Sequence, residues 1–160
     1  MKKIVCFLLS MTLIFGCFGM SAHAEETVYP KGSHTFTGTE DYASDEWTVD
    51  LRGAYLGGGT SVIAREAVNR ISISGSTTAT RVCDKIVLTL HVERSTSYAT
   101  GYSTYKTYTY TANNVYQLVK EISNIPVERG YYYRVKGVHS VTHNGVIETT
   151  DTLTNPLDYR

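Results

Sequence analysis

Cysteine and histidine are the side chains with which this sequence could carry out a reaction. Cys83 is the one cysteine beyond residue 24, so it has no disulfide partner within that part of the chain. As a nucleophile it would need a neighbouring base, which His91, His139 or His143 could supply. Unpaired cysteines are often buried as small hydrophobic residues, and we expect Cys83 to be buried at the start of a strand. Pairing of Cys83 with a second molecule stays open.

A second chemical possibility is metal binding. His139 and His143 have the H-x-x-x-H spacing that places two ligands on one face of a helix. Here they bracket a strand end and a turn, where that geometry fails, and zinc would need a third protein ligand. We therefore expect exposed histidines near this turn. The acidic stretch from Glu40 to Asp50 lacks the alternating pattern of a calcium loop, so we expect no metal site there either.

Short catalytic motifs are missing from the sequence. It contains no Gly-x-Ser-x-Gly elbow, no phosphate-binding loop and no HExxH run. We predict that the protein is not an enzyme and uses no cofactor. The alternative hypothesis is a secreted hydrolase or metal-dependent enzyme that uses His91, His139, His143 or Cys83.

Tyrosine is the residue type that points most directly to binding. The sequence has 13 tyrosines, and several fall in one short stretch: Tyr98, Tyr102, Tyr105, Tyr108 and Tyr110. A tyrosine ring is rigid and apolar with a polar tip, so it can stack on a sugar or grip a peptide. The other explanation is that tyrosine simply favours strands. By alternation we expect Tyr108 and Tyr110 to face the core, and Tyr98 and Tyr105 to face outward as candidate ligand-binding residues.

The elements that must position these residues are strands. From residue 57 onward the apolar pattern has a period of two, most clearly in Lys85 to Glu93, whose expected core-facing residues are Ile86, Leu88, Leu90 and Val92. Val115 to Ile122 also fits helical spacing, but Pro126 and the neighbouring strands favour a strand. Asn144-Gly145 favours a type I′ hairpin turn. About seven short strands and no convincing helix predict an all-β domain, a β-sandwich.

The sequence before residue 57 divides into two segments. Met1 to Ala24 has a basic start, an apolar middle and a small-residue end, which is typical of a secretory signal and too short for a membrane span. Lipid attachment at Cys17 is the alternative. Residues 25–56 are polar and turn-rich, so we expect a loosely ordered arm, joined through a flexible Gly57-Gly58-Gly59 to a domain at residues 57–157.

The charge balance limits the possible partners. Without residues 1–24 the chain keeps 13 basic and 15 acidic residues, a formal charge of −2. Binding along nucleic acid needs clustered lysine and arginine, so we expect no nucleic-acid partner. About 136 residues suffice for one domain, and we expect a monomer.

Two resemblances add to this interpretation. The stretch Ile125-Pro126-Val127-Glu128-Arg129-Gly130-Tyr131-Tyr132-Tyr133-Arg134-Val135 resembles the corner and strand of fibronectin type III and other immunoglobulin-like domains, with Tyr131 or Tyr133 placed like a tyrosine corner. Tyr55 to His139, through Ile71-Ser72-Ile73-Ser74-Gly75, Cys83-Asp84-Lys85 and Val92-Glu93-Arg94, resembles an uncharacterised family of small exported proteins of Gram-positive bacteria. That resemblance implies secretion and an all-β domain, and it supplies no active-site residues.

The resulting hypothesis is a secreted, non-catalytic binding or cell-envelope interaction module with an immunoglobulin-like β-sandwich. Its partner would be a glycan, a peptide or a cell-surface protein. A small toxin is a third hypothesis that depends on size and secretion alone.

Overall fold

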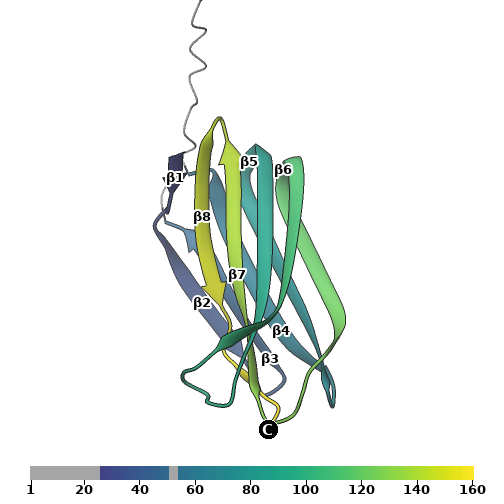
Figure 1. Ribbon diagram of the computed structural model, residues 1–160. Helices are drawn as coiled ribbons and strands as arrows, with labels where there is room; N and C mark the ends of the chain where they lie inside the picture. Colours follow the sequence, from purple (N-terminus) through teal and green to yellow (C-terminus); the bar gives the residue numbers. More distant parts are fainter. Residues whose placement is uncertain (1–25, 51–53) are drawn as a thin grey trace, which may run out of the picture.

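The computed structural model describes residues 26–50 and 54–160 (Figure 1). The expected signal segment, residues 1–24 with Cys17, lies outside the described residues. In the described part of the chain, no helix is long and apolar enough to cross a membrane.

The described chain is all-β, as the sequence predicted, and its strands form one curled sheet. The strands are β1 (Glu26–Val28), β2 (Gly32–Gly38), β3 (Tyr42–Val49), β4 (Leu56–Ala67), β5 (Arg70–Ser95), β6 (Ser103–Pro126), β7 (Tyr132–His143), β8 (Val146–Leu153) and β9 (Leu157–Asp158). Their order is β1-β8-β7-β5-β4-β3-β2, with β6 paired to β5 and β9 to β7. Only β1 and β8 run parallel among these pairs.

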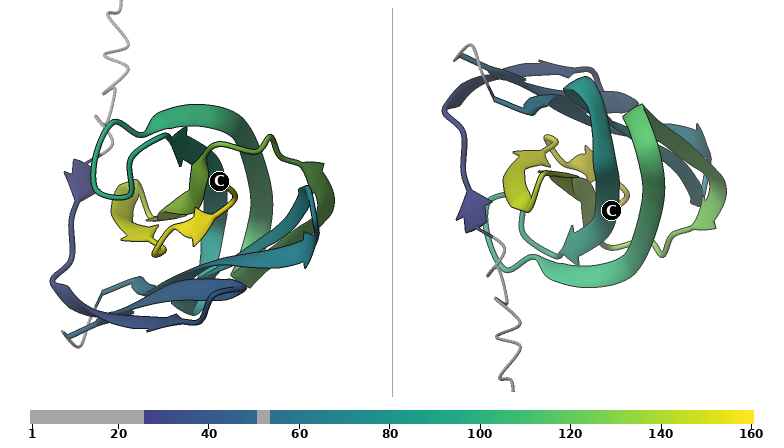
Figure 2. Two further views of the ribbon diagram at one scale, coloured as in Figure 1. Left: turned by 90° about the horizontal axis from the view of Figure 1, so that it is seen from below. Right: turned by 90° about the horizontal axis from the view of Figure 1, so that it is seen from above.

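The long hairpin of β5 and β6 belongs to both halves of this sheet. Residues 70–79 of β5 pair with β4, residues 85–95 pair with β7, and β6 runs along both parts. The register of β5 and β6 shifts between Thr78 and Cys83. A shift of this kind bends a strand, so the hairpin folds over and brings the two halves of the sheet face to face (Figure 2). Contacts of β3 with β8, and of β4 with β7 and β8, close the interior.

The apolar core follows the predicted alternation. The four residues expected to face inward on β5 are fully buried: Ile86, Leu88, Leu90 and Val92. On β7 the inner face continues through Tyr133, Val135 and Val141, all fully buried. The predicted hairpin turn is also confirmed, because Asn144 and Gly145 have positive φ angles of 51° and 78°.

The segment expected to be a loose polar arm is different in the structure. It contains β1, β2 and β3, and Ala43, Asp45 and Trp47 of β3 are buried at alternate positions. A buried aspartate between two apolar residues hid this alternation. Pairing of β3 with β4 along Tyr42–Thr48 then orders the segment.

The three glycines expected to form a flexible joint lie inside β4 instead. A Cβ on Gly59 would lie 2.5 Å from Cγ of His139, so only glycine allows β4 to approach β7 this closely. Gly59 therefore serves packing between the two halves of the sheet.

At the corner between β6 and β7, the Tyr133 hydroxyl bonds to the backbone of Glu128. The Tyr133 hydroxyl accepts from the Glu128 amide at 2.9 Å and donates to the Glu128 carbonyl at 3.2 Å. Tyr133 is fully buried, so this contact fixes the turn against the core.

Candidate functional site

The histidine at the centre of β7 is a core residue. His139 is fully buried, and its Nδ1 and Nε2 each lie 2.9 Å from a hydroxyl, those of Thr77 and Thr152. Burial lowers the pKa of His139 to about 4, so the ring is neutral at physiological pH. The expectation of an exposed histidine is wrong here because the inward alternation of β7 continues beyond Val135.

The other candidate catalytic groups contact different partners. His91 Nδ1 lies 2.9 Å from the Thr107 hydroxyl, while half-buried His143 packs its ring against Tyr55 at 4.7 Å between ring centroids. Cys83 is buried, as predicted, and its thiol donates to the Arg81 carbonyl at 3.4 Å. Burial raises the pKa of this thiol, which disfavours the reactive thiolate.

A cluster of metal ligands is also missing from residues 26–50 and 54–160, where no three His, Cys, Asp or Glu side chains are placed to hold an ion. In the stretch considered for calcium, Asp45 instead accepts from the Leu153 amide at 2.7 Å and lies 2.9 Å from Nδ1 of His34. This fully buried carboxylate joins β3 to β8 beside a cavity of about 300 Å³. This pair was not predicted from the sequence, because the aspartate interrupts the apolar alternation of Ala43 and Trp47 on the inner face of β3.

The two tyrosines predicted to bind a ligand lie in different environments. Tyr105 is the extra residue of a bulge, because Val92 pairs with Lys106 and Glu93 with Thr104. The bulge turns the Tyr105 ring inward, 5.8 Å from that of Tyr133, so the predicted outward orientation is wrong. Tyr108 and Tyr110 pack against the core as expected.

Tyr98, by contrast, is 56% exposed. Its ring meets Tyr132 edge-on at 5.4 Å between centroids, and its carbonyl accepts from the Tyr102 hydroxyl at 2.9 Å. Tyr98 is therefore an exposed ring that contacts Tyr132 on one side, on a backbone held by Tyr102.

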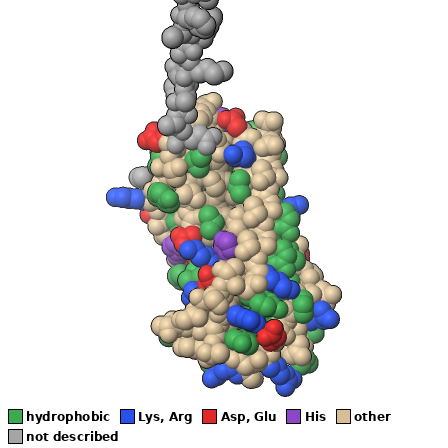
Figure 3. Space-filling view, viewed as in Figure 1, with side chains coloured by type: hydrophobic (Ala, Val, Ile, Leu, Met, Phe, Trp, Pro, Cys, Tyr) green, Lys and Arg blue, Asp and Glu red, His purple; other side chains and the backbone are tan. Residues whose placement is uncertain are grey.

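Tyr98 belongs to the lower end of the molecule, which we define as residues 39–41, 65–70, 94–103, 126–134 and 156–160 (Figure 1). In the face seen in Figure 3, lysine and arginine side chains gather toward this end. The strand ends and turns that form it carry most of the described arginines: Arg65, Arg70, Arg94, Arg129, Arg134 and Arg160.

Four of these arginines repeat one arrangement, in which the guanidinium lies over a tyrosine ring and pairs with a carboxylate. The groups are Arg65 with Tyr159 and Asp41, Arg94 with Tyr105 and Glu128, Arg134 with Tyr102 and Glu93, and Arg160 with Tyr132 and Asp158. The guanidinium carbons lie 3.8–4.7 Å from the ring centroids, within cation–π range. Stacking and ion pairing together hold each guanidinium in one orientation.

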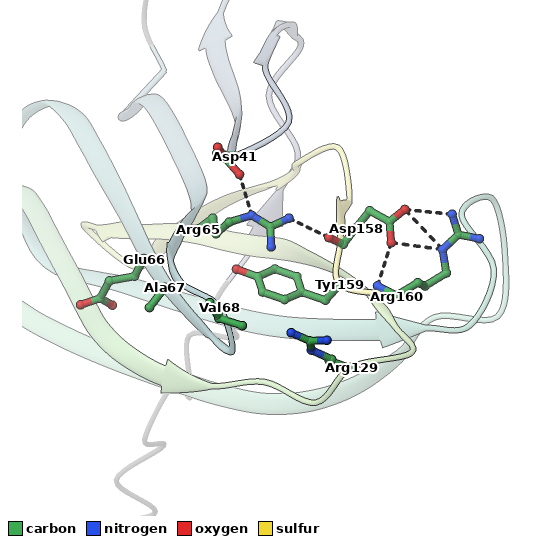
Figure 4. A pocket seen from close by; sticks show the side chains of 9 residues that line it. All are labelled: Asp41, Arg65, Glu66, Ala67, Val68, Arg129, Asp158, Tyr159 and Arg160. Carbon is green, nitrogen blue, oxygen red and sulfur yellow. Dashed lines mark hydrogen bonds and ion pairs between the residues drawn. The ribbon is translucent and has the colours of Figure 1, made fainter.

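A cavity of about 440 Å³ opens at the lower end (Figure 4). The residues that line it are Asp41, Arg65, Glu66, Ala67, Val68, Arg129, Asp158, Tyr159 and Arg160. Hydrogen bonds from Arg160 lower the pKa of Asp158, and burial raises the pKa of Tyr159, so the first is ionised and the second neutral at physiological pH.

A chain of side-chain contacts connects the cavity to Tyr98 through Arg160 and Tyr132. Arg160 contributes to the cavity and stacks on Tyr132 at 4.4 Å, and Tyr132 supports Tyr98. Arg65, Arg129 and Arg160 were not among the site residues predicted from the sequence. The arginines at the predicted strand ends could have indicated this site. However, the sequence does not show that these strand ends meet, because that depends on how the β5–β6 hairpin folds over.

Comparison with known proteins gives a family without an assigned activity. A family described as a family of unknown function (DUF6147) matches residues 21–157. A search of curated proteins found no match.

Proposed function

The chain belongs to DUF6147, a family of unknown function, and we propose that it is a secreted, non-catalytic binding or cell-envelope interaction module. The observation that carries the proposal is Tyr98, an exposed ring held edge-on by Tyr132 next to an arginine-lined cavity. An aromatic ring fixed in place loses little conformational freedom on binding, which suits recognition of a sugar or a peptide.

The positions of the reactive side chains support binding over catalysis. A nucleophile and its base must come within hydrogen-bond distance. Cys83 donates to a backbone carbonyl, His139 contacts two threonines, and His91 contacts a third. These contacts give none of them a catalytic partner among the described residues.

We further propose that the curled sheet is a β-sandwich of the immunoglobulin-like type. The facing halves of the sheet and the Tyr133 corner support this assignment. The β5–β6 hairpin departs from that pattern, because it runs through both halves of the sheet.

Binding to a glycan and peptidoglycan array would test the proposed function. We expect the protein to bind, and Tyr98→Ala to weaken binding by about 1 kcal/mol or more through lost stacking, with no loss of fold. Tyr116→Ala is the matched control, since Tyr116 is also exposed, at 59%, but lies on β6 away from the lower end. Equal affinities of the two variants, or no binding to any member of the array, would contradict the proposal.

A further inference from the structure

We propose that the cavity at the lower end binds the carboxylate of an acidic sugar between Arg65 and Arg129. The inference depends on the proposed binding function and names the ligand class for the same surface. Both guanidinium groups line the cavity (Figure 4).

Arg65 is the fixed donor of this site. Its Nε donates to Asp41 at 2.6 Å and its Nη2 to the Asp158 carbonyl at 2.7 Å. Its guanidinium also lies 4.1 Å from the centre of the Tyr159 ring. These contacts orient the group, and no described residue accepts a hydrogen bond from its Nη1. A carboxylate could therefore meet this nitrogen with little rearrangement.

Arg129 is the arginine of the cavity that forms no ion pair with a described carboxylate. Its closest polar contact among the described residues is a 3.5 Å approach of Nε to the side-chain oxygen of Asn69. Arg65 and Arg160 each pair with a carboxylate, but Glu66 accepts from the Asn124 amide at 2.6 Å and points away from Arg129 (Figure 4). An anion in the cavity would thus gain a charge-assisted contact without breaking an existing ion pair.

The size and surroundings of the cavity favour a sugar. About 440 Å³ exceeds the space that a single small anion fills, and Ala67 and Val68 offer an apolar wall to a ring. Tyr98 is connected to the cavity through Tyr132 and Arg160, and a neighbouring sugar could stack on its exposed ring. An extended peptide usually adds to a sheet edge, whereas this cavity lies at strand ends.

Titration with oligogalacturonate and with its methyl ester would test the inference. The two probes share one sugar backbone and differ in charge. We expect the acidic form to bind at least about tenfold more tightly, with an affinity that falls as salt rises. Hyaluronan oligosaccharides and their carboxyl-reduced form would repeat the comparison on another backbone.

Arg129→Gln should abolish this preference, and Arg129→Lys should restore part of it. Arg129 is exposed and makes one long contact, so the fold should persist, which circular dichroism would verify. Arg81→Gln, the same charge change on an exposed arginine near Tyr55, should leave the preference intact.

The outcomes separate the two proposals. Equal binding of acidic and neutral sugars, still weakened by Tyr98→Ala, would overturn the carboxylate site alone. If polyglutamate binds as tightly as the acidic sugars and its binding depends on Arg129, the ligand is an acidic peptide and the sugar assignment is wrong. Full competition by inorganic phosphate at similar concentration would reduce the site to a simple anion site. Absence of binding to every probe, with Tyr98→Ala silent on the array, would overturn both proposals.

Discussion

At the residue scale, the interior of this protein contains polar groups that the sequence did not reveal. His139, Thr77, Thr152 and Ser61 form one hydrogen-bonded group, in which the Ser61 and Thr152 hydroxyls lie 2.6 Å apart. An alternating pattern identifies which side chains point inward. The nearby Asn144-Gly145 turn favoured an exposed His139, although the alternation places this residue on the inner face of β7. Only the partners from β4, β5 and β8 show why its burial is tolerated.

Protonation of His139 should therefore govern part of the pH dependence of stability. The pKa of His139 is about 4 in the folded protein and takes its ordinary value of 6.5 in the unfolded chain. The unfolded state therefore takes up the proton first as pH falls. The stabilisation is complete above about pH 6.5 and is lost towards pH 4, a decrease on the order of 3 kcal/mol in the unfolding free energy. Denaturant unfolding across this range should show a flatter profile for His139→Gln.

His91→Gln is the control for that measurement, because His91 is only partly buried and contacts a hydroxyl on a strand edge. It should keep the wild-type profile. A His139→Gln profile as steep as that of the wild type would contradict the assigned protonation behaviour.

At the element scale, the central strand was the most predictable part of the fold. A period of two requires only that one face be buried, and β5 satisfies it from Ile86 to Val92. The bulge at Tyr105 was not predictable, because one extra residue reverses the facing of a tyrosine without changing its neighbours in sequence. The candidate site was not predictable either, because it lies where the ends of several strands meet, and the sequence of one strand does not show which other ends lie beside it.

Leu88→Ala should test the facing of β5. Leu88 is fully buried, so its truncation should lower the unfolding free energy by about 2–5 kcal/mol through lost burial and a cavity. Thr89 points to the opposite face and is partly exposed, so Thr89→Ala should cost far less. Chemical denaturation of both variants gives the two unfolding free energies. Similar, small decreases in both variants would show that Leu88 does not face the core.

At the scale of the whole molecule, both backbone and side-chain contacts join the two halves of the sheet. The β5–β6 hairpin joins them through the backbone, and buried carboxylates join them again elsewhere. Glu148 of β8 accepts from the amides of Tyr55 and Leu56, each at 2.7 Å, and Asp45 accepts from the Leu153 amide. The sequence indicated an all-β domain, but buried charges far apart in sequence gave no sign that they meet these amides.

Glu148→Ala should show whether the halves fold as one unit. The substitution leaves two backbone amides, one of them buried, without their acceptor, and an unsatisfied buried donor costs about 1–3 kcal/mol. We expect a single unfolding transition at lower denaturant, because both halves share one core. Glu121→Ala, at an exposed position on β6, should leave the midpoint within about 0.5 kcal/mol of the wild type. Two separate transitions in Glu148→Ala would mean that the halves unfold independently, and an unchanged midpoint would mean that the Glu148 contacts contribute nothing to their association.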